Sequence, residues 1–274
     1  MNALTSRQGW HAELTLGYQL RGEKTRLVDS KREGPLAVQR AFYPEGEVCH
    51  TYLLHPPGGV VAGDDLNIDL TVSKDAKVLL TTPGATKFYR SIGPVAEVFQ
   101  RLDVACEGSL EWMPLENIFF PGTQSHIVTE VHLESGAHFI GWEINCFGRP
   151  SNEERFDTGR ISSEMRIYRD GEPVLFDRFA TDANSLIDSA IGLKGVSGYA
   201  SMVATVDDQD LLEQVQQLLS NDPLSGATMM DGLLVVRTIS EQSQEVISLF
   251  SEVWRLIRPR SLGKEAVVPR IWAT

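Results

Sequence analysis

Apolar and polar side chains alternate along most of the first three quarters of the chain. The clearest runs with mostly apolar side chains at every second position cover residues 14–20, 66–72, 127–133, 138–146 and 161–167. A period of two is that of a β-strand, whose successive side chains point to opposite faces of the sheet. Each run therefore predicts a strand with one face turned toward a core.

Turn-forming residues separate these runs. Such pairs and clusters are Gly34-Pro35, Pro56-Pro57-Gly58-Gly59, Pro83-Gly84, Gly93-Pro94, Pro121-Gly122 and Asp170-Gly171. Many short strands without a helical pattern between them predict an all-β body over about residues 10–205. A parallel α/β fold is disfavoured, because no crossover helices are visible.

The last quarter of the chain has a different pattern. Apolar residues recur at helical spacing over 211–219, behind the candidate caps Asp207 and Asp208. A strand is expected at about residues 232–239. A second and clearer amphipathic helix covers residues 246–257, and we expect Pro259 to end it.

These patterns together predict the fold class. We expect a mainly β protein with a β-solenoid or sandwich-like body of many strands, at about residues 10–205, and a small α+β C-terminal portion with two helices, at about 206–274. No linker or internal repeat divides the chain, so residues 1–274 are expected to form a single domain. The tail, residues 262–274, is too apolar for a free end and is expected to dock on the fold or on a partner.

Composition narrows the class of partner. The formal net charge is −12 over 274 residues, and no basic stripe is present, which argues against nucleic acid. The N-terminus lacks a signal-peptide pattern and no apolar run is long enough to span a membrane, so a cytoplasmic protein with no membrane partner is expected. Cys49, Cys106 and Cys146 are few and widely spaced, which favours free thiols.

Familiar catalytic signatures are absent from the sequence. No Walker loop, HExxH, paired CxxC or GxSxG motif occurs. The glycine-rich stretch at residues 58–63 has the wrong spacing for a dinucleotide fingerprint, and a predicted strand follows it. Without a helix N-terminus there is no dipole to hold a phosphate. Its glycines instead indicate a tight turn or a close approach of two backbones.

Possible metal ligands are scattered rather than clustered. Cys49 and His50 are adjacent, so in a regular strand they point to opposite faces, and His50 is expected to be a core histidine. His55 begins the glycine-rich turn and is freer to reach a metal ion. A further group of ligand types shares one strand face, where solvent exposure is the expected state: His126, Glu130 and His132.

Among the acidic residues, Glu143 is the most informative. It lies within the apolar run FIGWEINCF, and a carboxylate there needs water, a partner or a cation, since unpaired burial costs roughly 3–5 kcal/mol. Taken singly, the other acids are expected to be solvated or to cap turns: Asp64, Asp65, Glu111, Glu116, Glu154 and Asp177. A pair of them could also suggest the acid and base of a glycosidase, although the sequence gives no separation.

Lys87 and Arg90 flank two aromatic residues in the stretch KFYR. Three roles stay open for them: neutralising nearby carboxylates, contacting a partner, or simply lying at the surface beside core aromatics.

A series of short motifs resembles one known family in the right order. The motifs are Gly34-Pro35-Leu36, Gln39-Arg40, Phe42-Tyr43-Pro44, Leu54-His55-Pro56-Pro57-Gly58-Gly59 with Gly63-Asp64, Thr82-Pro83-Gly84-Ala85 with Lys87-Phe88-Tyr89-Arg90, Leu110-Glu111-Trp112 with Pro114, Phe119-Phe120-Pro121-Gly122, Gly148-Arg149 and Pro269-Arg270-Ile271-Trp272. From about residue 9 to 274 the chain resembles the UreD family of urease accessory proteins. One departure is Glu153, which stands where the family usually has a glycine before an acid, here Glu154. If that glycine needs a positive φ, the loop is expected to be reshaped and the role of Glu154 becomes doubtful.

The resemblance implies a non-catalytic protein of mainly β fold with a helical C-terminal portion. It implies binding to apo-urease together with a UreF-like accessory protein and a UreG-like GTPase, and nickel(II) in transit rather than a tightly bound cofactor. An alternative is a pure interaction scaffold that bridges apo-urease to the GTPase complex without handling metal.

The resemblance also implies that nickel passes through a conduit inside the protein, and this indicates what kind of ligands the conduit needs. Several weak ligands suit transfer better than one closed site, because an ion that is held too tightly is not released. The candidate transient nickel or conduit positions are Glu47, Asp64, Glu143 and Asp177, with Cys49 and His55 behind them.

Overall fold

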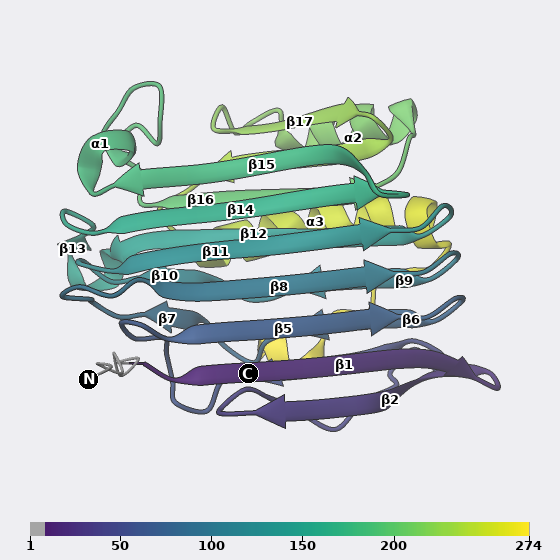
Figure 1. Cartoon of the computed structure of the whole chain (residues 1–274). Coiled ribbons are helices and arrows are strands. Elements are labelled where there is room, and N and C mark those ends of the chain that lie inside the picture. The colour runs from purple at the N-terminus through teal and green to yellow at the C-terminus, as the bar shows by residue number, and fades with distance from the viewer. Residues whose placement is uncertain (1–8, 274) are drawn as a thin grey trace, which may run out of the picture.

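The computed structural model describes residues 9–273 and places them in three layers (Figure 1). A front sheet of seven strands faces a middle sheet, and two helices cover the other side of the middle sheet. Residues 1–8, on which part of the signal-peptide expectation rests, lie outside the described residues. Within the described helices, none is long and apolar enough to cross a bilayer.

The front sheet has a single order of strands. They are β15 (Glu172–Asp182), β14 (Arg160–Arg169), β11 (Gln124–Leu133), β8 (Ala96–Val104), β5 (Asp65–Val72), β1 (His11–Arg21) and β2 (Lys24–Glu33). The middle sheet runs β17 (Ser225–Met230), β18 (Leu233–Ile239), β16 (Gly198–Thr205), β12 (His138–Arg149), β9 (Ser109–Met113), β6 (Lys77–Thr81), β4 (Cys49–Leu54) and β3 (Ala37–Val38). Three short strands attach beside this path: β7 (Thr86–Phe88), β10 (Asn117–Phe119) and β13 (Glu154–Arg155).

The chain coils between the two sheets. Strands β4, β6, β9 and β12 pair in parallel in the middle sheet, and β5, β8, β11 and β14 pair in parallel in the front sheet. Each crossover between parallel neighbours is therefore a strand of the opposite sheet rather than a helix. This arrangement confirms the predicted solenoid-like, mainly β fold class and explains why parallel pairing occurs without crossover helices.

Burial explains the alternating pattern. In β5, Leu66 and Ile68 are buried between the sheets, whereas Asp69 faces solvent. Strand β12 differs because the middle sheet is covered on both sides. Its Phe139 packs into the core between the sheets, and Trp142 packs toward the helices, which is why the run there is almost continuously apolar.

The C-terminal portion contains both expected helices, α2 (Gln209–Leu219) and α3 (Ser243–Leu262). Asp208 caps α2 as predicted, because its carboxylate accepts a hydrogen bond from the Leu211 amide at 2.9 Å. The expected end of the second helix was wrong. Pro259 lies inside α3, which continues to Gly263, whose φ of 64° ends it.

Strand β17 and the short helix α1 (Asn184–Ile187) were not predicted. Strand β17 precedes the expected strand β18, and the two form a hairpin through Asp231 and Gly232, which both have positive φ. That pair is the usual signature of a two-residue hairpin turn. Helix α1 follows β15.

The apolar tail docks on its own fold. Trp272 lies in the 3₁₀ turn η2 (Arg270–Ala273), with its ring 5.4 Å from that of Trp142 and 6.1 Å from that of Trp254. Its indole nitrogen donates a hydrogen bond to the Thr81 hydroxyl at 2.9 Å. Of the two expected docking sites, the fold itself is the one observed.

Candidate functional site

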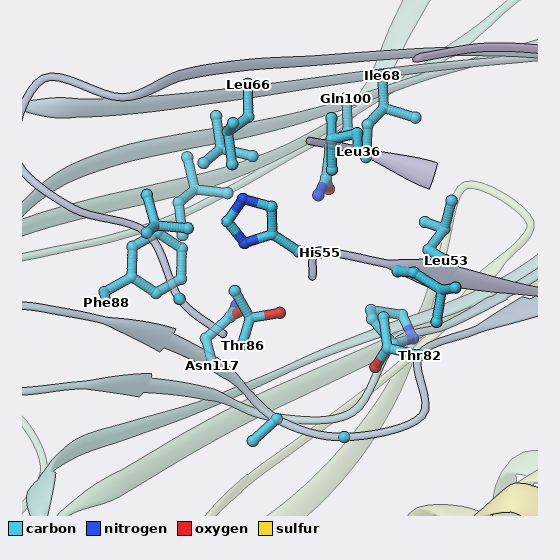
Figure 2. Close-up of a pocket in the computed structure, with 18 of the residues that line it drawn as sticks. Leu36, Leu53, His55, Leu66, Ile68, Thr82, Thr86, Phe88, Gln100 and Asn117 are labelled. Carbon is cyan, nitrogen blue, oxygen red and sulfur yellow. The ribbon is translucent and has the colours of Figure 1, made fainter. Parts of the chain in front are cut away.

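A cavity of about 230 Å³ lies between the two sheets (Figure 2). Leu66, Ile68 and Gln100 of the front sheet form one wall. The opposite wall is formed where the middle sheet is interrupted, between the end of β6 and the start of β7 and between the end of β9 and the start of β10. Because the ladder is broken there, space remains between the layers that side chains do not fill.

His55 follows β4 and points into this cavity (Figure 2). Among the described residues, neither of its buried ring nitrogens has a hydrogen-bond partner. Burial lowers the pKa of the imidazole below its ordinary value, and the nearby charge of Asp64 only partly opposes this. A buried polar group without a partner needs an explanation, and a neutral imidazole is a common metal ligand.

The lowered pKa of His55 gives a testable pH dependence. The unfolded chain takes up a proton on this imidazole more readily than the folded chain, so His55 makes folding less favourable as the pH falls through 6.5. We expect His55→Leu to lose less stability than the wild type between neutral and mildly acidic pH. Urea unfolding across that range measures it, and parallel pH profiles for the two proteins would contradict the burial of the ring.

The glycine-rich turn that follows His55 is held by Asp64. The Asp64 carboxylate accepts hydrogen bonds from the amide of Trp10 at 2.8 Å and from that of Val61 at 2.9 Å. The strand β5 follows the turn, as predicted, so the segment is not a phosphate loop. Asp64 thus caps a turn, which was the expectation for a single acid, and both of its oxygens already have partners.

Gly59 shows why this turn needs a glycine. A Cβ at this position would lie 2.4 Å from the Tyr89 ring and 2.7 Å from the Lys87 carbonyl oxygen. We expect Gly59→Ala to destabilise the fold by about 1–3 kcal/mol, because the backbone has no room for a methyl group. Gly84→Ala is the matched control, since nothing lies within 4 Å of a Cβ there. Equal unfolding midpoints of the two variants in urea would refute the close approach.

Glu143 of β12 lines the same cavity. The Asn145 amide donates to its carboxylate at 2.7 Å, and the Ser163 hydroxyl donates to the same oxygen. Asn145 in turn accepts from the Asn117 amide at 3.1 Å. Burial raises the pKa of Glu143, and the charge of Asp177 raises it further, so the site favours a proton or a cation on this carboxylate.

Asp177 of β15 lies farther along the space between the sheets. It accepts hydrogen bonds from Ser201 at 2.8 Å and from Tyr199 at 3.4 Å, and it forms an ion pair with Arg237 at 3.2 Å. Arg237 was not identified from the sequence. The available signal was its position between Val236 and Thr238, within the strand expected at about residues 232–239.

Cys49 and Glu47 lie toward the opposite end of β4 from His55. The Cys49 thiol faces the core between the sheets, 3.8 Å from the Tyr43 hydroxyl, and burial raises its pKa. Glu47 lies at the surface, 2.6 Å from Lys264 and 2.8 Å from Lys77. These two ammonium groups lower the pKa of Glu47 to about 2.

The six predicted conduit positions therefore do not converge on one point. The structure brings His55 and Glu143 to one cavity, with Asp64 and Asp177 close to it, and places Cys49 and Glu47 at a distance. Within residues 9–273, no three His, Cys, Asp or Glu side chains are grouped so that they could hold a metal ion. The candidate residues are thus separated along the interior and do not form one closed group.

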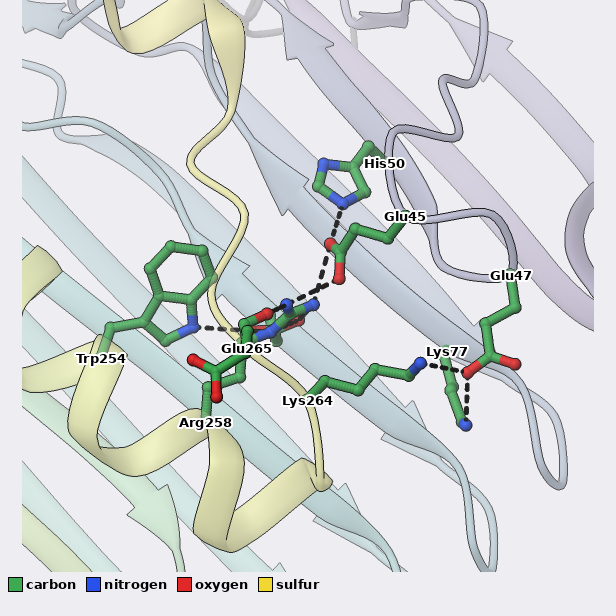
Figure 3. Close-up of polar contacts among 9 residues, drawn as sticks. Glu45, Glu47, His50, Lys77, Trp254, Arg258, Lys264 and Glu265 are labelled. Carbon is green, nitrogen blue, oxygen red and sulfur yellow. Dashed lines mark hydrogen bonds and ion pairs between the residues drawn. The ribbon is translucent and has the colours of Figure 1, made fainter.

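His50 belongs to a buried ionic network on the other face of the middle sheet (Figure 3), and Glu111 joins it through Arg258. His50 is buried and lies 2.6 Å from Glu45, which confirms the expected core histidine. The expectation for Glu111 was wrong, because it neither faces solvent nor caps a turn. It accepts hydrogen bonds from Trp254 at 2.7 Å and from the fully buried Arg258 at 2.9 Å, and Arg258 also pairs with Glu45.

Two surface expectations have clear outcomes. His126 and His132 lie on the solvent side of the front sheet, 2.9 Å from Glu97 and 2.7 Å from Glu130, so the solvated strand face is confirmed. At the position where the family usually has a glycine, Glu153 itself adopts the left-handed conformation with φ 57°. A side chain other than glycine there costs roughly 1–2 kcal/mol. Its neighbour Glu154 pairs with Arg149 at the surface.

The fold and the interior define a class of protein. It is a two-sheet β-solenoid whose chemistry-bearing side chains line an internal space, with a helical layer on one side. The chain belongs to the UreD urease accessory protein family, whose model matches residues 11–273.

Individual relatives agree with this assignment over nearly the whole chain. The urease accessory protein UreD of Alcanivorax borkumensis is 46% identical, covering 97% of this chain and 93% of its own length. That of Aliivibrio fischeri is 45% identical over 98% of both chains. That of Escherichia coli is 43% identical, covering 98% of this chain and 99% of its own.

Proposed function

We propose that this chain is a non-catalytic accessory protein of urease maturation that passes nickel(II) ions through its interior to apo-urease. In this proposal it acts in a complex with a UreF-like accessory protein and a UreG-like GTPase. Membership of the UreD family and the similarity to urease accessory proteins support the role in urease maturation. The interior of the chain supports the passage of metal.

One observation carries the proposal for nickel. His55 presents two buried nitrogens, which have no partner among the residues that the structure describes, to a cavity that is also lined by Glu143. Imidazole nitrogen suits nickel, and a carboxylate supplies a second, weaker ligand. Among the described residues, no third His, Cys, Asp or Glu completes a closed metal site with these two, and an ion bound by two such ligands is held loosely, which suits a carrier that must release it.

Three of the candidate nickel positions have a structural role instead, as the scaffold alternative expects. Asp64, Asp177 and Glu47 each have their carboxylates engaged by hydrogen bonds or ion pairs within the chain. Such residues stabilise the fold without binding metal. Among the described residues that line the cavity, Glu143 is the one carboxylate, so the geometry does not support a glycosidase that needs an acid and a base in one pocket.

Deleting the gene for this chain tests the proposal. Cells should then contain the urease polypeptides at normal levels, but the purified urease should be inactive and poor in nickel by elemental analysis. Restoring the wild-type chain should restore both the nickel content and the activity. Urease with its normal nickel content in the deletion strain would contradict the proposed function.

A further inference from the structure

One end of the solenoid carries an apolar and basic surface that the proposed nickel path does not use. It lies where β7 ends and β8 begins, on the left in Figure 1. We call it the end patch and define it by its exposed residues: Val61, Lys87, Tyr89, Arg90, Ile92 and Val95.

Hydrogen bonds and packing contacts hold three members of the end patch in place, namely Lys87, Tyr89 and Arg90. The Val60 amide donates to the Lys87 carbonyl at 2.7 Å and the Tyr89 amide donates back to Val60 at 2.9 Å, which fixes the glycine-rich turn beside β7. The Tyr89 ring packs edge-on against Phe120, with 4.9 Å between their centres. The Arg90 side chain lies over Gly122, where a Cβ would be 2.6 Å from its Cγ. Backbone pairing and packing thus hold Lys87, Tyr89 and Arg90 at this end of the solenoid, and Ile92 and Val95 follow Arg90 within five residues of the chain.

Ile92 protrudes from an ordered turn in this surface. Its side chain is 95% exposed. The buried Ser91 holds the turn, because its hydroxyl accepts from the Gly93 amide at 3.1 Å and donates to the Pro94 carbonyl at 2.5 Å. A fixed turn loses little conformational entropy on binding, so it presents Ile92 in a conformation ready for a partner.

The charge of the end patch is opposite to that of the protein as a whole. The chain carries a net charge of −12, yet within residues 9–273 neither Lys87 nor Arg90 forms an ion pair. Arg149 adds a third cation, 4.7 Å from the Phe120 ring, although Glu154 neutralises it. Exposed apolar patches mark interaction sites, and tyrosine and arginine are enriched among the residues that contribute most to protein–protein binding.

We propose that the end patch docks a protein surface with an apolar depression rimmed by aspartate and glutamate. Ile92 enters the depression, Tyr89 packs at its edge, and Lys87 and Arg90 pair with the acidic rim. This inference rests on the proposed function, and on that basis the partner is apo-urease. The patch adjoins the turn that follows His55, so a partner bound there lies beside the part of the chain that contains the cavity.

Binding of purified metal-free urease apoprotein to the full chain tests this surface. The variant Lys87→Glu/Ile92→Asp should bind on the order of 100-fold more weakly than the wild type, because it removes two central contacts. The matched control is Leu20→Asp/Arg21→Glu, which makes the same kinds of change at exposed residues where β1 ends, at the opposite end of the solenoid (Figure 1). It should bind as the wild type does. Added salt should weaken wild-type binding more than that of the end-patch variant.

Each other outcome is decisive. Equal binding by the wild type and the end-patch variant overturns the docking surface and leaves the proposed function standing, whereas a wild type that does not bind the apoprotein overturns both. Sedimentation that shows a wild-type dimer lost only in the end-patch variant assigns the patch to a second copy and overturns the proposal. The proposal is also overturned if phosphatidylglycerol vesicles bind the wild type but not the end-patch variant while both proteins bind urease equally well.

Discussion

Replacing Arg258 by methionine should lower the free energy of unfolding by about 3–5 kcal/mol. Arg258 is fully buried and contacts the carboxylates of Glu111 and Glu45 (Figure 3). Methionine fills the space of the aliphatic part of the side chain but leaves both carboxylates without their cation. Equilibrium unfolding in urea measures the loss.

The pH dependence of this variant has a definite sign. Burial already raises the pKa of Glu111, and Arg258 is the group that opposes this rise. Without Arg258 the folded chain holds a proton on Glu111 more tightly than the unfolded chain does. The stability deficit of Arg258→Met should therefore be largest at neutral pH and become smaller as the pH falls toward the ordinary range of a glutamate.

Two further variants make the Arg258 prediction specific. Arg260→Met removes a cation from the same helix, but Arg260 is exposed and pairs with Asp208 at the surface, so its loss should cost less than about 1 kcal/mol. Adding Glu111→Gln to Arg258→Met should recover much of the stability, since the amide still accepts from Trp254 and carries no charge. Equal losses in the Arg258 and Arg260 variants would refute the buried network.

Replacing Glu143 by glutamine should have the largest effect on function. The amide keeps the shape of the side chain and can still accept from Asn145 and Ser163, but it cannot supply an anionic ligand. We expect the nickel content and the activity of matured urease to fall by about tenfold or more, as for other lost metal-site interactions. Urease assays and elemental analysis of urease purified from variant cells measure both.

A stability measurement separates this loss from unfolding. Because burial raises the pKa of Glu143, the ionised carboxylate opposes folding at neutral pH, and the glutamine variant should be at least as stable as the wild type. Glu172→Gln, at the exposed start of β15, is the matched control and should change neither urease maturation nor stability. Normal urease activity with the Glu143 variant would favour the scaffold alternative.

The positions of strands could be predicted from the sequence where one face of the strand is exposed to solvent. The front sheet shows this, since Leu66 and Ile68 alternate with the polar Asn67 and Asp69, and solvent enforces the period of two. The pairing of strands was not predictable in the same way. Parallel neighbours such as β5 and β8 are set by how successive coils stack, and that stacking leaves no pattern within either strand.

The site was predictable only in part, for a similar reason. Glu143 stood out because a carboxylate interrupts an apolar run, and His55 because it begins a turn. The cavity that joins them depends on where β6 and β9 end, and no local pattern marks those ends as neighbours. Arg258 was missed although it follows Trp254 by four residues on the apolar face of α3, where a charge signals a buried partner.

The nickel content of urease matured with the double variant His55→Leu/Glu143→Gln tests the central claim most directly. The variant removes both proposed ligands from the cavity, and copurification with apo-urease and the GTPase complex verifies that assembly is intact. The account predicts an assembled complex that delivers urease with less than about a tenth of the normal nickel. A normal nickel content from that assembled complex would contradict passage of the ion through the interior.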